Sequence, residues 1–146
     1  MTRLQRIVTI GVAAACLAWS GPILSGQGAT SSATVEIPPN ATALEGIPNV
    51  RIDVAEAGTT RRVLDRAEAA REHLRVSVVD GEYYWTTREN RRLRVDMSGA
   101  FTYLSSDPGK YIRVTRTNDK LSYVEHVDFG SRSVTWWGEL EIVIAK

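Results

Sequence analysis

The sequence is poor in residues that cross-link a protein or charge it strongly. Cys16 is the single cysteine among 146 residues, so no disulfide can form within the chain and a hydrophobic core must stabilise the fold. The formal net charge is only +1, and without Arg3 and Arg6 the chain has 16 basic and 17 acidic side chains. This balance lacks the basic footprint of nucleic-acid-binding proteins, so we expect no nucleic-acid partner.

Motifs of common enzyme classes are missing as well. The chain has no Gly-x-Ser-x-Gly elbow, no dinucleotide-binding glycine fingerprint, no P-loop and no His-Glu-x-x-His. Its histidines are His73 and His126, whereas zinc sites usually need three or four protein ligands. We therefore expect neither a metal site nor a cofactor. The pattern favours a non-catalytic role without excluding an enzyme.

Residues 1–26 are typical of an export signal. Arg3 and Arg6 precede the uncharged apolar run Ile7–Leu17, and small residues follow at 18–28. The run is shorter than the roughly 20 residues of a membrane-spanning helix, and the order of basic, apolar and small residues marks a cleavable secretory signal. We expect a secreted or periplasmic protein.

The stretch VAAAC, which ends at Cys16, resembles a bacterial lipobox. In that motif the cysteine becomes the lipidated first residue of the mature chain. The motif prefers Leu or Val three positions before the cysteine, where this chain has Ala13. A lipoprotein anchored to the membrane at Cys16 is therefore the alternative to simple cleavage, and it is the only membrane attachment that we expect.

Residues 27–49 are expected to form a flexible linker. They are rich in Ser, Thr, Ala and Gly, and Pro38, Pro39 and Pro48 obstruct both helices and central strands. Apolar residues alternate with polar ones from Val50 onward, as in a half-buried strand. We therefore predict a single β-rich domain over residues 50–146.

The stretch RVSVVDGEYYWT, residues 75–86, predicts a β-hairpin. Asp80-Gly81 is a preferred pair for a two-residue type I′ turn, in which both residues have positive φ. That turn sets three cross-strand pairs, Val78–Tyr83, Ser77–Tyr84 and Val76–Trp85. Tyr83 and Trp85 are predicted to face the core and Tyr84 to face outward, because the opposite register would bury Ser77 and Arg75.

The remaining segments predict more strands and one helix. In residues 133–144 the alternation places Trp136 in the core and Trp137 on the polar face, with Gly138 at a bulge or bend. Residues 65–74 are expected to form the helix, because Asp65 and Glu68 have the spacing of a capping box. Turn residues separate several short strands between 91 and 129. The fold class is therefore all-β with one short helix, a small antiparallel β-sandwich or barrel.

Two groups of side chains are candidates for ligand binding. Tyr84 and Trp137 lie on polar strand faces, and exposed aromatic rings offer rigid apolar area to a sugar or a peptide. Arg88, Arg91 and Arg92 lie in one charged segment, where guanidinium groups can grip an anion or pair with nearby acids. The alternative for both groups is structural: the aromatic rings are covered and the arginines are neutralised.

Residues 125–128 carry the candidates for catalysis. Glu125 has the parity of apolar neighbours, so its side chain should face the core, where a carboxylate must be paired, hydrogen-bonded or neutral. A carboxyl of this kind can serve as a general acid, although a structural bond to an arginine or tyrosine is the commoner use. His126 and Asp128 share the opposite face of the strand.

These observations favour an exported β-domain of the bacterial envelope or extracellular space that binds a protein or a glycan. The alternative is a small envelope hydrolase that uses Glu125 or Asp128 with His126. A third hypothesis is a domain completed by a strand from a partner.

Overall fold

The computed structural model describes residues 34–117 and 119–146. The predicted export signal, Cys16 and residues 27–33 of the predicted linker lie outside these residues. Strands dominate the described part, and the one helix is short. The all-β prediction is confirmed, and the architecture is a barrel rather than a sandwich.

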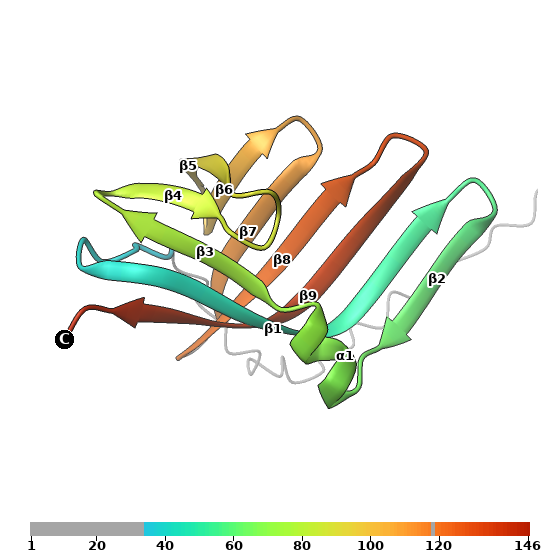
Figure 1. Ribbon diagram of the computed structural model, residues 1–146, viewed down its shortest axis with the longest axis horizontal. Helices are drawn as coiled ribbons and strands as arrows, with labels where there is room; N and C mark the ends of the chain where they lie inside the picture. Colours follow the sequence, from blue (N-terminus) through green and yellow to red (C-terminus); the bar gives the residue numbers. More distant parts are fainter. Residues whose placement is uncertain (1–33, 118) are drawn as a thin grey trace, which may run out of the picture.

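Eight antiparallel strands close into the barrel, and a ninth, β2, extends beside it (Figure 1). Neighbours in the barrel follow chain order from β3 to β9, while β1 pairs with both β3 and β9 and so closes the ring. The strands are β1 Ala41–Ala55, β2 Gly58–Val63, β3 Leu74–Val79, β4 Glu82–Trp85, β5 Arg91–Ser98, β6 Phe101–Asp107, β7 Lys110–Thr117, β8 Lys120–Asp128 and β9 Arg132–Ile144.

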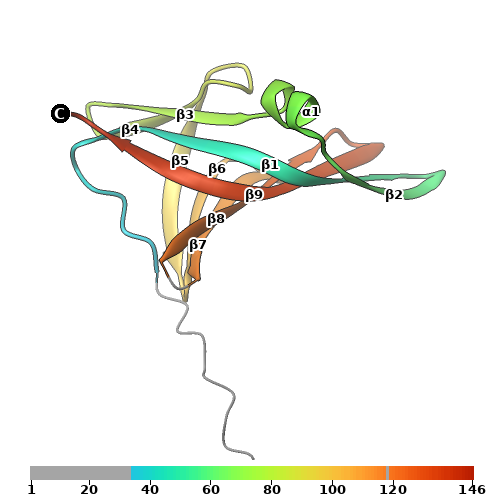
Figure 2. The same cartoon turned by 90° about the horizontal axis from the view of Figure 1, so that it is seen from below.

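The first strand begins earlier than the sequence pattern indicates. Residues 41–49, which were predicted as linker, belong to β1, and Val35 is buried with 1% of its surface exposed. Residues 34–40 run from the β5–β6 turn to the start of β1 (Figure 2). The Thr102 hydroxyl donates a 2.6 Å hydrogen bond to the Val35 carbonyl and ties this segment to β6. The prolines led to the prediction of a linker, because proline usually argues against a strand. Pro48 is tolerated here because it lies at an irregularity in the ladder.

That irregularity is a bulge in β1 rather than in β9. Pro48 is in register with Gly138 and Val50 with Trp137, so Asn49 is the extra residue. Gly138 serves another purpose there. A Cβ atom on Gly138 would lie 2.1 Å from the Ile47 carbonyl oxygen, so only glycine allows this close approach of the two strands.

The hairpin prediction is confirmed residue by residue. Val78 pairs with Tyr83, Ser77 with Tyr84 and Val76 with Trp85. Asp80 and Gly81 both have positive φ, as the type I′ turn requires. Trp85 is buried, Tyr83 is half-buried against the core, and Tyr84 points outward.

Inward-facing side chains fill the barrel. Leu104 and Ile112 are fully buried, and each contributes about 1.5–3 kcal/mol through burial of apolar area. Trp136 is also buried, whereas Trp137 on the next position is partly exposed, as the alternation predicts. A bulky ring fits at Tyr123 because it packs on Gly46, where a Cβ atom would lie 2.5 Å from the ring.

The helix α1 spans Arg66–Arg71. Its predicted capping box is confirmed: the Glu68 N–H donates to the Asp65 carboxylate, and the Asp65 N–H donates to the Glu68 carboxylate. Its buried alanine is Ala69. A helix this short takes its orientation from tertiary contacts, and here they bury Ala69 against the barrel.

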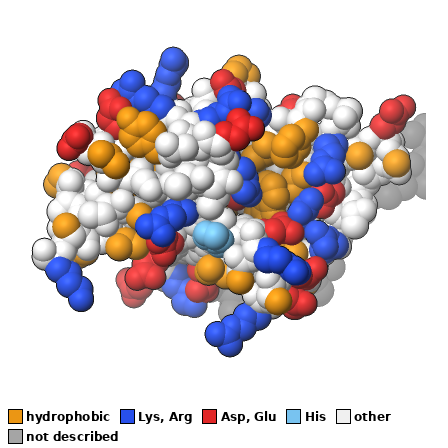
Figure 3. Space-filling view, viewed as in Figure 1, with side chains coloured by type: hydrophobic (Ala, Val, Ile, Leu, Met, Phe, Trp, Pro, Cys, Tyr) orange, Lys and Arg blue, Asp and Glu red, His pale blue; other side chains and the backbone are white. Residues whose placement is uncertain are grey.

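The helix lies at one end of the barrel, together with the β4–β5 loop of residues 86–90 (Figure 2). The β6–β7 and β8–β9 turns reach the same end, because strand directions alternate. We call this the helix end. In the space-filling view of the face that carries α1 and β3, apolar surface lies among clusters of positive and negative side chains (Figure 3).

Candidate functional site

A ladder of aromatic rings crosses the outside of the barrel over β6, β7 and β8. It consists of Phe101, Tyr103, Tyr111 and His126, which we call the outer aromatic face. The ring centroids are 6.2 Å apart for Phe101–Tyr103, 6.0 Å for Tyr103–Tyr111 and 5.2 Å for Tyr111–His126. These rings point outward because Leu104 and Ile112, at the adjacent positions, point into the core. All four remain partly exposed.

A groove of about 550 Å³ borders these rings on β5, β6 and β7. We call it the polar–aromatic groove, and its characteristic side chains are Arg94, Asp96, Tyr103, Asp107 and Tyr111. Asp107 forms an ion pair with Arg91, with 2.6 Å between the carboxylate oxygen and the guanidinium nitrogen. Arg94 and Asp96 form no ion pair with any described residue, so their polar atoms are available to a ligand.

The two aromatic residues selected from the sequence lie far apart on the barrel. Tyr84 is on the outer face of β4, where its hydroxyl donates a 2.8 Å hydrogen bond to Glu82. Trp137 is on the outer face of β9, in register with Val124 of β8. Strands β1 and β3 separate β4 from β9 on the shorter path around the barrel. Tyr84 and Trp137 therefore do not form one surface.

The three candidate arginines each have an acidic partner. Arg91 lies 2.7 Å from Glu89 and 2.6 Å from Asp107. Arg92 pairs with Glu82 on the outer face. Arg88 instead reaches into the barrel. The segment therefore does not present a cluster of free guanidinium groups, and its arginines contact three separate parts of the molecule.

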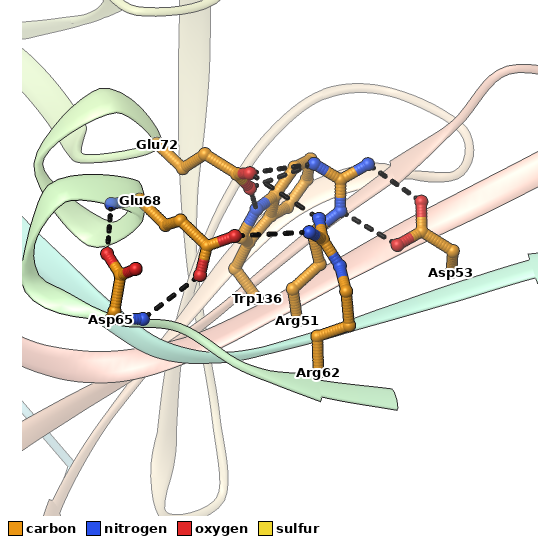
Figure 4. A network of polar contacts seen from close by, with 7 residues as sticks. All are labelled: Arg51, Asp53, Arg62, Asp65, Glu68, Glu72 and Trp136. Atoms are coloured by element: carbon orange, nitrogen blue, oxygen red, sulfur yellow. Dashed lines mark hydrogen bonds and ion pairs between the residues drawn. The ribbon is translucent and has the colours of Figure 1, made fainter. Parts of the chain in front are cut away.

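Arg51 is the centre of a polar network at the helix end (Figure 4). Its guanidinium group donates to Asp53 at 2.7 and 2.8 Å and to Glu72 at 2.9 and 3.0 Å. Glu72, the C-cap of α1, also accepts a hydrogen bond from the Trp136 indole N–H. The hydrogen bond with Arg51 lowers the pKa of Asp53 and raises that of Arg51. The network ties α1 to β1 and β9.

Trp136 connects this network to the β4–β5 loop. The Arg51 guanidinium carbon lies 5.3 Å from the centroid of the Trp136 ring, and that of Arg88 lies 4.8 Å away. Cations above an indole are attracted by the electron-rich ring. Trp136 therefore contacts both arginines. Each arginine also forms an ion pair with its own acidic residues.

Glu125 is fully buried and forms an ion pair with Arg88, whose Nε lies 2.8 Å from the carboxylate. Burial raises the pKa of Glu125 to about 7, and the positive charge of Arg88 opposes that rise. The Trp85 indole N–H also lowers this pKa, yet neither Glu125 oxygen accepts a hydrogen bond of good geometry. The inward direction of Glu125 agrees with the sequence pattern.

The structure does not bring Glu125 together with His126. Glu125 points into the barrel, whereas His126 stacks on Tyr111 outside it, and the His126 Nδ1 lies 2.9 Å from the Thr135 hydroxyl. Asp128 accepts a 2.7 Å hydrogen bond from the Gly130 N–H in the β8–β9 turn. The carboxylates and the imidazole therefore have separate structural partners.

The sequence pattern missed the polar–aromatic groove and the Arg51 network. The outward direction of Tyr103 and Tyr111 could have been predicted from the sequence, since both alternate with buried apolar residues in their strands. The pairing of Arg51 with Glu72 could not have been predicted, because the two are 21 residues apart and meet only through the packing of α1 on the barrel.

No protein-family model, curated protein or solved structure matches this chain. Within residues 34–117 and 119–146 there is no helix long and apolar enough to cross a membrane. The same residues contain no group of three His, Cys, Asp or Glu side chains with the arrangement of a metal site. Functional inference therefore depends on the geometry of the two regions described above.

Proposed function

We propose that the protein is an exported binding module of the bacterial envelope or extracellular space, and that it binds a glycan in the polar–aromatic groove. The observation that carries the proposal is the composition of that groove. Tyr103 and Tyr111 supply aromatic rings beside Arg94 and Asp96, whose charged groups form no ion pair within the described residues.

The chemistry of such a groove suits a sugar. A sugar ring has apolar C–H faces and a rim of hydroxyl groups. Aromatic side chains offer large rigid area to the faces at a low entropic cost. Carboxylate and guanidinium groups accept from and donate to adjacent hydroxyls with charge-assisted hydrogen bonds. The groove places both kinds of group on neighbouring antiparallel strands, which hold them in a fixed relation.

The experiment that tests the proposal is a screen of soluble oligosaccharides on the full chain, followed by calorimetric titration of any that bind. We expect saturable binding that Tyr103→Ala weakens about three- to tenfold, from the loss of an aromatic contact. Tyr84→Ala is the matched control, because it removes an outward tyrosine that lies outside the groove. An absence of binding, or equal losses in the two variants, would contradict the proposal.

Export is a second part of the proposal and has its own measurement. The basic, apolar and small-residue order of residues 1–28 supports it. The intact mass of protein recovered from the envelope or medium of a bacterial host distinguishes simple cleavage of the export signal from lipidation at Cys16. A full-length cytoplasmic product would contradict export.

A hydrolase that uses Glu125 or Asp128 with His126 has less support from the geometry. The two catalytic groups of such an enzyme must reach one substrate. Glu125 and His126 lie on opposite faces of β8, and Asp128 is bonded within a turn. We therefore propose binding rather than hydrolysis.

A further inference from the structure

A small cavity of about 80 Å³ lies at the helix end and shares Ser106 with the polar–aromatic groove. Three of its lining residues are apolar, Trp85, Val127 and Phe129. The other five are polar or charged: Arg88, Glu89, Arg91, Ser106 and Lys110. It is therefore a partly apolar recess whose wall contains three cationic side chains and one acidic side chain, Glu89. We call it the Arg88 cavity.

Two polar groups of the Arg88 cavity lack partners among the described residues. The Ser106 hydroxyl is buried and makes no hydrogen bond. Lys110 forms no ion pair within the described residues. The pKa of the neighbouring Glu89 is lowered chiefly by its hydrogen bond with Arg91 and to a smaller extent by the charge of Lys110. Buried polar groups in proteins nearly always have a hydrogen-bond partner, so an unpaired hydroxyl beside a cavity indicates a missing one.

Arg88 stands between the cavity and the buried Glu125. Its Nε lies 2.8 Å from the Glu125 carboxylate, and its side chain also lines the cavity. Stacking on Trp136 holds the guanidinium group in this position. A guanidinium group has five N–H donors and binds a carboxylate through two of them, so Arg88 can exchange one carboxylate for another with little movement.

We propose that the Arg88 cavity binds a small carboxylate with a short apolar stem, and that Glu125 takes up a proton from solvent when the ligand binds. The ligand carboxylate pairs with Arg88 and Lys110 and accepts a hydrogen bond from Ser106. The apolar stem lies against Trp85, Val127 and Phe129. Because one anion enters and one carboxylate is neutralised, the net charge beside Arg88 is unchanged.

The size of the cavity sets the ligand class. A water-sized group needs about 10–15 Å³ of this kind of volume, so 80 Å³ admits several such groups and no more. A free short-chain acid and the C-terminal residue of a peptide, if its side chain is small, share the required chemistry. A long acyl chain does not fit.

The groups that face Glu125 explain why proton uptake occurs near neutral pH. From the β4–β5 loop comes the positive charge of Arg88, and from the end of α1 comes the negative charge of Glu72, which raises the pKa of Glu125. Tyr123 on β8 is neutral, because burial and the nearby Glu125 raise its pKa. Trp85 on β4, Ile112 on β7 and Trp136 on β9 carry no charge. With a pKa of about 7, Glu125 changes protonation over the physiological range.

The test is calorimetric titration of the full chain with propionate, N-acetylalanine and N-acetylalaninamide at pH 6 and pH 8. We expect both carboxylates to bind and the amide not to bind. Affinity should fall about tenfold from pH 6 to pH 8, since a group with a pKa of 7 passes from mostly protonated to mostly ionised. Titrations in buffers of different ionisation enthalpy should show uptake of nearly one proton per ligand at pH 8.

Four variants separate this site from its surroundings. Glu125→Gln should make the affinity independent of pH and abolish proton uptake. Lys110→Met should weaken binding at least threefold, whereas Lys120→Met, an exposed lysine paired with Glu139, should have no effect. Tyr103→Ala in the polar–aromatic groove should also leave the affinity for carboxylates unchanged. The proposal of glycan binding and the proposal of carboxylate binding can therefore fail independently.

The outcomes decide the inference whether or not each variant folds. Absence of saturable binding by both carboxylates at pH 6 overturns it, and so does equal binding of the amide. Zero proton uptake by the unaltered protein at pH 8 also overturns it, and that measurement needs no variant. Tighter binding of N-acetylalanine than of propionate identifies a peptide C-terminus as the ligand. The reverse order identifies a free acid.

Discussion

At the helix end Arg88 and Glu125 meet inside the protein, whereas on the outer aromatic face Tyr103 and Tyr111 meet at its surface. The core of the barrel is otherwise apolar, so the buried Glu125 and the exposed aromatic rings are local exceptions. The usual distribution buries apolar groups and exposes charged ones. The exceptions lie beside the polar–aromatic groove and the Arg88 cavity, which are the two places where we propose ligands.

The two regions differ in what holds them together. The rings of the outer aromatic face follow one another across hydrogen-bonded strands, so the sheet alone sets their spacing. The helix end instead joins α1, β1, β9 and the β4–β5 loop through Arg51, Glu72, Trp136 and Arg88. The outer aromatic face should therefore tolerate substitution, and the helix end should not.

The largest expected effect comes from Glu125. Its pKa is raised to about 7 in the folded protein from an ordinary value of 4.5, so the folded state binds the proton more tightly than the unfolded state does. Its contribution to stability is complete below about pH 4.5 and is lost as the pH rises through 7. The loss is about 3 kcal/mol, at 1.36 kcal/mol for each pKa unit.

Urea denaturation at several pH values measures this effect. Glu125→Gln should flatten the dependence between pH 4.5 and 7.5. Asp53 does not contribute in this pH window, because its hydrogen bond with Arg51 lowers its pKa below the ordinary value of 3.8. Stability that rises through this window, or an unchanged slope in Glu125→Gln, would contradict the assignment.

Arg51→Ala should produce the second largest effect. The substitution removes hydrogen bonds to Asp53 and Glu72 and the contact with Trp136. Hydrogen bonds to charged groups contribute about 1.5–3 kcal/mol each at best, and these are partly exposed, so we expect a loss of about 2–3 kcal/mol. Urea denaturation at pH 7 measures it, and Arg51→Lys should recover only part because lysine lacks the planar fork. A loss below about 0.5 kcal/mol would mean that the network is incidental.

The sequence pattern predicted what depends on neighbours along the chain. The hairpin register followed from Asp80-Gly81, the directions of Trp136 and Trp137 followed from alternation, and the capping box followed from the spacing of Asp65 and Glu68. Each of these is decided within a few residues. The inward direction of Glu125 followed from the same parity rule.

Features that depend on distant parts of the chain were not predictable in this way. The choice of barrel over sandwich depends on the pairing of β1 with β9, which are the first and last strands in the sequence of the domain. The start of β1 at Ala41 depends on the same pairing, which overrides the prolines. Arg88 was grouped with Arg91 and Arg92 because they are close in sequence, yet the turn directs only Arg88 toward Glu125.

Tyr111→Ala should have a smaller effect, on the outer aromatic face. It removes an edge contact with Tyr103 and a stacked contact with His126. Aromatic pairs contribute about 0.5–1.5 kcal/mol beyond area burial, and both contacts are partly exposed, so we expect a loss of about 1 kcal/mol. Thermal denaturation measures it, with Tyr111→Phe as the control that keeps both ring contacts. A loss as large as that of Arg51→Ala would erase the distinction between the two regions.

The smallest effect is expected for Arg92→Ala, and it sharpens the comparison most directly. Arg92 and Arg51 both form ion pairs with acids, but Arg92 and Glu82 have 68% and 40% of their side chains exposed, against 18% and 22% for Arg51 and Glu72. Exposed ion pairs contribute about 0–1 kcal/mol and are screened by salt. We expect a loss under about 0.5 kcal/mol at 0.15 M salt and none at 1 M, measured by urea denaturation. If Arg92→Ala and Arg51→Ala were equally destabilising, the arginine-acid pair itself would be the cause. If only Arg51→Ala destabilises the protein, the cause is the position of Arg51 between α1, β1 and Trp136.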